Sequence, residues 1–457
     1  MIAVPHVVKG ETLHGGDVEH ASDTAPFATP KLDLEQLVWS RLEPGPAFDV
    51  PVAEIIELLV ATGRALGDDA DGVLAEALEH NARTNPLDRG VLQRQYESLP
   101  YLFDGDRLRF QLESELGGTD VIDGWRRVEV PDGRRCAIRA FPPRLVHVMA
   151  GNSPGVAAAS VARGALTKGV HLLKLPSNDL FTATAVLRVM AKLAPEHPVV
   201  RSFSAVYWRG GDEDVESALF RPQFFDKLVA WGGESTIRSA VRYIGPGFEL
   251  VAFDPKSSIS FIGREAFASD DALRDAASCA AIDATFLNQQ ACVASRFMYV
   301  EGTPDDADRF CAALVDEMGV EREAASAIGP PLAPEMREEI EALRTLEPLY
   351  RVFGSFDGRG VAIRSDEPVD FHPDGKVVNV IPVASFVDAV RFANVSTQTV
   401  GVYPPSRVVE VRDRLASAGT QRIVSLGKAG NMPTGLAHDG FLPLHRFLRW
   451  VNDEGDS

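Results

Sequence analysis

A single cysteine follows a run of polar amides in the segment Phe286-Leu-Asn-Gln-Gln-Ala-Cys292-Val-Ala-Ser-Arg296. A cysteine where a loop meets a strand can face a cleft, and neighbouring backbone N–H groups then lower the pKa of its thiol. This pattern makes Cys292 a candidate nucleophile. The alternative is a small buried apolar residue, which is the common fate of a free cysteine. Cys136, Cys279 and Cys311 lie in segments predicted to be strand or helix, and they fit that alternative.

Asn152 stands in Gly-Asn-Ser-Pro-Gly, between an apolar run and an Ala-rich segment. Its amide could donate a hydrogen bond into a cleft, or it could cap the following helix. Ser153 suits the cap better, because proline follows it at the first helical position. Lys174 ends the apolar run HLLK, where a lysine often marks only a solvated edge of a sheet.

Two further groups are weaker candidates. Gly232, Gly233 and Ser235 follow the apolar run KLVAW, and bare backbone at a helix N-terminus suits an anion. Any tight strand-to-helix connection can use such a turn, however. His438 precedes Asp439 and Gly440, so it belongs either to a proton relay or to a surface turn that ends in glycine.

The elements that must position these residues form a repeated pattern. Short apolar runs alternate with helical segments, which indicates βαβ units in a parallel sheet covered on both faces. Ligands of such sheets bind beyond the carboxyl ends of the strands, so residues 151–155, 176–179 and 232–235 are the expected binding loops. The predicted strands are 144–150, 171–175, 204–208 and 227–231, and the helices are 156–168, 180–193, 215–220 and one from 235.

The flanking regions are predicted from the same signals. Residues 1–50 lack periodicity and are expected to form an irregular arm, and a turn at Pro-Asp-Gly predicts a hairpin before residue 139. A second α/β domain is expected from Ser258. Helices are predicted at 51–66, 71–81, 270–284, 306–318, 334–346 and 385–394, the last capped by Ser385 with Asp388 three residues on.

Composition limits the function. The 457 residues carry 46 basic and 65 acidic side chains, a net charge of −19, which argues against a nucleic-acid-binding protein. No apolar run approaches the roughly 20 residues that span a bilayer. The start of the chain shows no secretory signal, and four dispersed cysteines give neither zinc spacing nor a disulfide framework. We therefore expect a cytoplasmic protein of two or three domains without a metal site or a membrane span.

With these motifs in place, the chain resembles the aldehyde dehydrogenase superfamily, and within it the LuxC-like long-chain acyl-CoA (fatty-acid) reductases of bacterial bioluminescence. The resemblance covers nearly the whole chain. It rests on VPHVVKGE near the start, ELGG and IDGW in 115–125, HVMAGNSPG (147–155), LTKGVHLLKLPSNDLFTATA (166–185), NQQACVASR (288–296), VNVIPV (378–383) and AHDGFLPLHRFLRWV (437–451).

The resemblance implies an α/β fold with three parts. Residues 1–257 would form an N-terminal arm and a Rossmann-like cofactor domain, with an arm hairpin near 125–140. Residues 258–425 would form the catalytic domain that carries Cys292. Residues 426–457 would return to the cofactor domain or to an oligomer interface. A homo-oligomer built through the arm and the C-terminal strand is expected.

The resemblance also implies roles for the candidate residues. Cys292 would be the nucleophile, and Asn152 would form an oxyanion hole with the backbone N–H of the nucleophile. Lys174 would face the ribose of a nicotinamide dinucleotide. Ser177 replaces the acidic residue of many NAD-preferring relatives, which favours NADPH over NADH. Gly232, Gly233 and Ser235 would face the pyrophosphate.

Three departures from the superfamily pattern matter. Ala252 stands where hydrolytic aldehyde dehydrogenases carry the glutamate that activates water, so a thioester on Cys292 would persist until it is reduced. The E-x-F-G-P motif that holds the nicotinamide ribose is replaced by FHPDGKVVNV (371–380), which leaves that contact unassigned. The spacing from the cysteine to the Ser-Arg pair also differs by one residue.

These implications predict NADPH-dependent reduction of a fatty acyl-CoA, or of an acyl-protein thioester, to the aldehyde. An acyl-protein synthetase or acyltransferase would be the partner enzyme, and His438 would lie near the acyl channel. Three alternatives remain open: an acyl-phosphate reductase resembling glutamyl-phosphate reductase, an NAD(P)-dependent aldehyde oxidiser that Ala252 disfavours, and a non-catalytic scaffold of a fatty-acid reductase complex.

Overall fold

The computed structural model describes residues 1–22 and 25–455, which fold into two compact units. Unit 1 contains residues 1–86, 95–254 and the segment from 433 onward, and unit 2 contains residues 87–94 and 255–432. The sequence predicted domain boundaries after residues 257 and 425. Residues 87–94 differ from this expectation. They were expected in the first domain, but they pack with unit 2. Arg94 binds Glu321 and the carbonyl of Glu323 in that unit.

Unit 1 is built around a seven-stranded sheet in the order β12-β11-β8-β9-β10-β2-β3. The five strands from β12 to β10 are parallel. The chain places β9 and β10 on one side of β8 and β11 and β12 on the other, so the connections change direction between β8 and β11. Open α/β sheets bind ligands at such a point. The strands are β8 (Arg144–Val148), β9 (Val170–Lys174), β10 (Phe203–Val206), β11 (Lys227–Trp231) and β12 (Glu249–Phe253).

The first part of the N-terminal region is not irregular as its sequence suggests, whereas residues 30–51 contain no helix or strand. β2 (His6–Val8) pairs antiparallel with β10, and all three of its residues are buried. The imidazole Nε2 of His6 accepts a hydrogen bond from the backbone of Tyr207. Strands of two or three residues are too short to show a period in the sequence. The remaining strands are β1 (Ile2–Ala3), β3 (Glu11–Leu13), β4 (Val18–His20) and β5 (Phe27–Thr29).

Helices complete unit 1, and the two that follow β8 and β9 match the predicted pattern. Ser153 caps α6 (Pro154–Leu166) by accepting a hydrogen bond from Gly155, and Pro154 occupies the first turn, as expected. The other helices are α1 (Val52–Asp68), α2 (Val73–Asn81), α3 (Arg89–Ser98, partly in unit 2), α4 (Gly105–Leu116), α5 (Asp120–Asp123), α7 (Thr182–Leu193), α8 (Pro198–Arg201), α9 (Glu213–Leu219), α10 (Glu234–Val241) and α16 (Pro443–Phe447).

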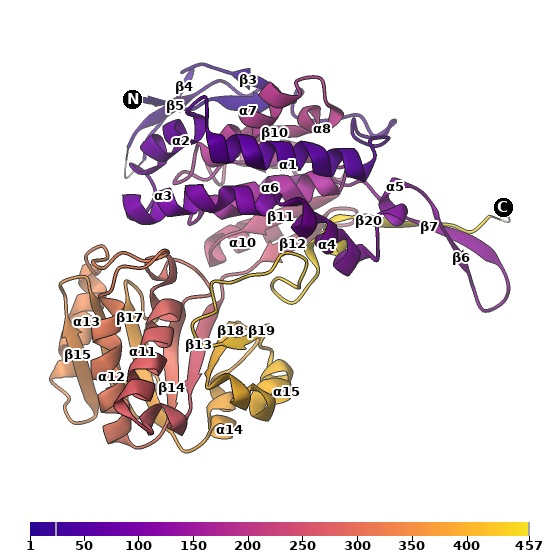
Figure 1. The fold of residues 1–457 in the computed structure, drawn as a ribbon. Helices are drawn as coiled ribbons and strands as arrows, with labels where there is room; N and C mark the ends of the chain where they lie inside the picture. The colour runs from indigo at the N-terminus through magenta and orange to yellow at the C-terminus, as the bar shows by residue number, and fades with distance from the viewer. Residues whose placement is uncertain (23–24, 456–457) are drawn as a thin grey trace. The chain divides into compact units, whose positions relative to one another are not determined.

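The hairpin predicted near 125–140 is present as β6 (Arg126–Glu129) and β7 (Arg135–Phe141). It extends away from the body of unit 1 (Figure 1). β20 (Arg449–Asp453), close to the C-terminus, pairs antiparallel with β7 and makes a three-stranded sheet.

Unit 2 contains a second seven-stranded sheet, in the order β15-β16-β17-β14-β13-β18-β19, which is parallel except for the pair β15–β16. Alanines of α11 pack closely into its core with α12. The strands are β13 (Ser257–Ile262), β14 (Ser295–Glu301), β15 (Tyr350–Ser355), β16 (Gly360–Ser365), β17 (Val377–Val383), β18 (Thr397–Tyr403) and β19 (Arg422–Ser425). The helices are α11 (Asp270–Thr285), α12 (Pro304–Met318), α13 (Pro334–Arg344), α14 (Phe386–Ala389) and α15 (Val408–Ala418).

The helix expected at 385–394 is shorter than predicted. Ser385 does cap it, with its hydroxyl accepting from the backbone of Asp388, but α14 ends at Ala389 and a 3-10 turn (Val390–Phe392) follows. Across the whole described part of the chain, none of the helices is long and apolar enough to cross a membrane.

A chain of hydrogen bonds is buried under α6. The hydroxyl of Thr167 donates to the carbonyl of Gly164, so it accepts from Nε2 of His171 at 3.2 Å. Nδ1 of His171 must then accept from Nε2 of His147, also at 3.2 Å. The ring of His171 is therefore neutral, because its Nδ1 carries no proton. Burial lowers the pKa of His147 to about 3, and burial together with His147 lowers the pKa of His171 well below its ordinary value.

This buried pair predicts loss of stability in acid. The unfolded chain takes up protons at these rings near pH 6.5, whereas the folded chain does not until near pH 3 for His147. Stability is therefore present above pH 6.5 and decreases below it, by at most about 1.4 kcal/mol per pH unit for each ring. Denaturant unfolding between pH 7 and 5 should show a smaller pH dependence for His147→Leu than for the wild type. The exposed His14→Leu variant is the control, and equal slopes in all three proteins would contradict the prediction.

Candidate functional site

The segment that carries Cys292 has a strained backbone. It connects α11 to β14, and its residues Leu287, Asn288 and Gln289 all have positive φ values, of 50°, 51° and 69°. A left-handed conformation costs about 1–2 kcal/mol for a residue with a side chain, so three in succession need support from their surroundings. Cys292 follows in a turn and is half-buried between the buried Ala291 and Val293. It lies just before the amino end of β14.

Gln289 supplies much of this support. Its side-chain amide binds the backbone of Val377 at the start of β17 in both directions, with Nε2 donating to the carbonyl at 2.9 Å and Oε1 accepting from the N–H at 3.1 Å. Arg296, on the far side of the cysteine, donates to the carbonyl of Gln289 at 2.7 Å. The same guanidinium binds Asp374 at 3.0 Å and the carbonyl of Pro373. Both ends of the cysteine segment are thus attached to residues 373–377.

Asn288 and Cys292 have attachments of their own. Oδ1 of Asn288 accepts from both the backbone N–H and the hydroxyl of Ser326, at 3.0 and 3.1 Å. The carbonyl of Cys292 accepts from the hydroxyl of Ser258 at 2.8 Å, and that hydroxyl accepts from the backbone N–H of Thr399. The amides that made NQQAC conspicuous in the sequence therefore hold the backbone of the segment.

Asn152 lies in unit 1, in the loop that joins β8 to α6, beside the point where the sheet connections change direction. Asn85 joins this loop to the one after β9, because its Nδ2 donates to the carbonyls of Gly151 at 2.7 Å and Asn178 at 3.1 Å. The two loops touch so closely that a Cβ on Gly151 would lie 2.0 Å from Oδ1 of Asn178. Nothing in the sequence identified Asn85 as part of this site.

The loop after β9 is fixed from below by a buried polar network. Asp179 accepts from Asn81 at 2.6 Å and from the hydroxyl of Thr182 at 2.7 Å, and the hydroxyl of Tyr96 contacts Thr182 at 2.7 Å. Burial raises the pKa of Asp179. This network leaves Ser177, at the tip of the loop, exposed.

Lys174 is the last residue of β9, as predicted, but it is not at a solvated edge. Its ammonium lies over the rings of Tyr207 and Trp208, 5.7 and 6.0 Å from their centroids. Burial lowers the pKa of Lys174 to about 8, and the carboxylate of Glu216 opposes this decrease. The exposed Arg209 follows Trp208 directly and acts electrostatically on Tyr207. Sequence reasoning missed Arg209, although its place after a parallel strand was a usable signal.

Gly232 and Gly233 follow β11, and α10 begins at Glu234, one residue before the predicted start. Gly232 has a φ of 148°, and a Cβ there would approach Thr236 to 3.1 Å, so this turn needs glycine. Gly233 caps α10 without a side-chain hydrogen bond, which leaves the first N–H groups of the helix for a ligand. Ser235 is exposed in the first turn. This geometry suits a phosphate group.

His438 lies in a reverse turn rather than in a close pair with its neighbour. Backbone hydrogen bonds join it to Phe441 in both directions, and Asp439 and Gly440 have positive φ values. Nε2 of His438 is 4.0 Å from the carboxylate of Asp439, which is too long for a hydrogen bond. The imidazole instead packs edge-on against Trp231 and Phe253, at the ends of β11 and β12. Ala252 precedes Phe253 in β12.

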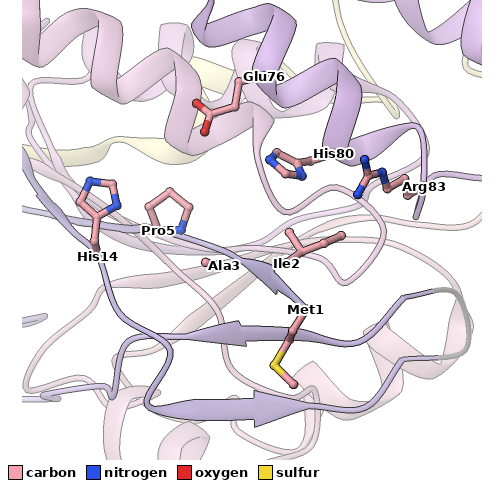
Figure 2. Close-up of a pocket in the computed structure, with 8 residues that line it drawn as sticks. All are labelled: Met1, Ile2, Ala3, Pro5, His14, Glu76, His80 and Arg83. Atoms are coloured by element: carbon pink, nitrogen blue, oxygen red, sulfur yellow. The ribbon is translucent and has the colours of Figure 1, made fainter.

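A cavity of about 400 Å³ in unit 1 does not coincide with these residues. Figure 2 shows its lining, and none of the predicted site residues belongs to it. Glu76, which lines it, pairs with Arg188, and His80 stacks on Phe181. The lining residues are Met1, Ile2, Ala3, Pro5, His14, Glu76, His80 and Arg83. No group of three potential metal ligands occurs within residues 1–22 and 25–455.

Comparison with known proteins agrees with this architecture. Residues 47–450 match a sequence family described as acyl-CoA reductase (LuxC). A long-chain acyl-protein thioester reductase of Photorhabdus luminescens is 32% identical over 353 residues, which cover 76% of this chain and 70% of the relative.

Solved structures show the fold. The NAD-dependent benzaldehyde dehydrogenase of Corynebacterium glutamicum has a TM-score of 0.72 at 14% identity, covering 99% of this chain and 98% of that one. The NADP-dependent glyceraldehyde-3-phosphate dehydrogenase of Bacillus halodurans C-125, complexed with NADP, has a TM-score of 0.71 at 14% identity, covering 99% of both chains. The chain therefore has the aldehyde dehydrogenase fold.

The contact between the loops after β8 and β9 is testable. Gly151→Ala should lower the free energy of unfolding by about 1–3 kcal/mol, because the added methyl overlaps Asn178 and forces the loops apart. Hydrogen exchange should rise in residues 149–153 and 176–181. Gly155→Ala is the matched control, since its Cβ meets only the hydroxyl of Ser153 at 3.3 Å. Wild-type exchange and stability in Gly151→Ala would show that the loops are not packed as described.

Proposed function

Because the chain belongs to the acyl-CoA reductase (LuxC) family, we propose that it reduces a long-chain acyl thioester to the aldehyde with NADPH, through an acyl-enzyme on Cys292. The observation that supports this most is the strained and firmly attached backbone that presents Cys292. Strain of this kind gathers where a reactive group must be held in one position. A thioester donor is further supported by the name of the relative from Photorhabdus luminescens.

In the proposed first stage the thiolate of Cys292 attacks the acyl carbonyl, and the donor thiol leaves. The negative charge that develops on the carbonyl oxygen is stabilised by the side-chain amide of Asn152 and the backbone N–H of Cys292. A donor of this kind typically contributes about 2.7–4 kcal/mol to transition-state stabilisation. The hydrogen bond from Ser258 to the carbonyl of Cys292 keeps the peptide plane of the nucleophile oriented.

The edge of the sheet in unit 1 suits a nicotinamide dinucleotide. Gly232, Gly233 and the start of α10 would hold the pyrophosphate, since the turn needs glycine and the helix N-terminus lacks a side-chain cap. Lys174, Ser177 and Arg209 would hold the ribose and a 2′-phosphate, which favours NADPH; NADH remains the alternative cofactor. When bound, the cofactor supplies hydride to the acyl-enzyme, and the resulting thiohemiacetal releases the aldehyde from Cys292.

Ala252 explains why reduction would prevail over hydrolysis. A methyl group cannot activate water, so the thioester on Cys292 persists until hydride reaches it. The arm sheet of β6, β7 and β20 is the proposed interface of a homo-oligomer, because it extends away from the body of unit 1 (Figure 1).

The role of the nucleophile is tested by Cys292→Ser. Oxidation of NADPH in the presence of a long-chain acyl-CoA should fall at least a thousandfold, because a serine hydroxyl is a far weaker nucleophile than a thiolate. NADPH binding, followed by fluorescence, should stay within twofold of the wild type. Cys136→Ser, in the arm hairpin, is the matched control and should retain activity. Substantial turnover in Cys292→Ser would refute the acyl-enzyme.

Cofactor preference is tested at Ser177. Ser177→Asp should raise the KM for NADPH at least tenfold, about 1.4 kcal/mol, because a carboxylate would repel the 2′-phosphate. The KM for NADH should change little or decrease. Ser177→Ala removes the hydroxyl without adding charge and should change the NADPH value only a few-fold. If the ratio of the KM values for NADPH and NADH is unchanged in Ser177→Asp, the ribose of the cofactor does not bind next to residue 177.

A further inference from the structure

A buried lysine stands beside the attachment points of the cysteine segment. Lys376 is fully buried and has a φ of 65°. Its ammonium donates to three backbone carbonyls, those of Met318 at 3.1 Å, Ser326 at 2.7 Å and Ala327 at 3.2 Å. Within the described residues no carboxylate pairs with it. All three of its protons are thus used to hold neutral oxygens in one place.

Burying the charge of Lys376 costs free energy of desolvation, and its three hydrogen bonds offset this cost. Burial lowers the pKa of Lys376 to about 8; Arg322 lowers it further, whereas Glu321 and Asp357 oppose the decrease. A hydrocarbon side chain of similar length would fill the same space without taking a charge out of water. What the lysine adds is three donors at the point where residues 318, 326 and 327 meet.

Two sets of hydrogen bonds connect Lys376 and its neighbour to the segment that carries Cys292. Ser326, whose carbonyl accepts from Lys376, uses its N–H and hydroxyl to bind Oδ1 of Asn288. Asn288 is the middle of the three left-handed residues before Cys292. Val377, which follows Lys376 directly, binds both ends of the Gln289 amide. The dipeptide 376–377 therefore supports two consecutive residues of the strained segment, one indirectly and one directly.

We propose that Lys376 is a positioning residue for the nucleophile, which acts through Ser326 and Asn288 to keep the segment 287–289 left-handed and Cys292 in its reactive orientation. This inference rests on the proposed function only in naming Cys292 as the nucleophile. Lys376 touches no reacting atom in this account. Its effect is to hold the segment that carries Cys292.

The test replaces Lys376 by methionine, which keeps the length of the side chain and removes the donors. Lys376→Met should alkylate at Cys292 with iodoacetamide at least fivefold more slowly at pH 7, measured by peptide mass spectrometry with Cys136 as the internal reference. With an acyl-CoA substrate, kcat should fall at least tenfold, while the KM for the thioester and the affinity for NADPH stay within twofold.

The matched control is Lys168→Met in unit 1. Lys168 is also a buried lysine with positive φ, but it pairs with Asp123 at 2.6 Å. This variant should lose stability without slowing alkylation of Cys292. Equal alkylation of Cys292 in folded Lys376→Met and in the wild type would overturn the proposal, and so would an equal decrease in Lys168→Met.

A second variant keeps the proposal falsifiable if Lys376→Met does not fold. Asn288→Gly removes the amide at a position whose backbone conformation glycine accepts freely, and it should slow alkylation to a similar degree. When Lys376→Met does not fold, wild-type alkylation in Asn288→Gly overturns the proposal. When it folds and Lys376 acts through Asn288, the double variant should be no slower than the slower single variant; additive effects would exclude this route. Alkylation needs no acyl substrate, so it separates this inference from the proposed function, which Cys292→Ser tests.

Discussion

The segment that leads to Cys292 depends on two amide side chains that compensate for an unfavourable backbone conformation. Leu287, Asn288 and Gln289 each adopt a conformation that disfavours a side chain. Gln289 offsets this cost by pairing with the peptide of Val377 as a neighbouring strand would, and Asn288 accepts two hydrogen bonds from Ser326. Without these bonds the segment would relax to right-handed or extended angles, and the direction of Cys292 would change with it.

Cys292 lies just before the amino end of a parallel strand, where groups from neighbouring strands hold its turn in place. Ligands of α/β sheets usually bind at the carboxyl ends, where the loops of unit 1 lie. In unit 2 the turn before β14 is covered instead by polar groups from the starts of β13, β17 and β18, through Ser258, Val377 and Thr399. Unit 2 therefore holds the proposed nucleophile in one position, whereas unit 1 has exposed loops suited to a dinucleotide.

In unit 1 the loops after β8 and β9 are held in position by close packing against each other rather than by a strained backbone. Asn85 joins the loops after β8 and β9, and Gly151 permits an approach that any side chain would prevent. The buried network around Asp179 fixes the second loop from below. The ammonium of Lys174 lies over two aromatic rings, and the carboxylate of Glu216 opposes the decrease in its pKa that burial causes. These features favour an anionic ligand at the edge of the sheet.

The sequence by itself determined the alternation of strands and helices, the caps at Ser153 and Ser385, and the motifs that carry the family resemblance, because these signals are local in the chain. It also singled out Cys292, Asn152 and Lys174. Only the tertiary structure decided which polar residues support them: Asn85, Ser326 and Lys376 are 66, 38 and 58 residues from the partners they bind. It also gave β2 its place beside β10 and residues 87–94 their place in unit 2. Hydrogen bonds over such separations produce no periodic pattern in a single sequence, because only the folded chain brings their partners together.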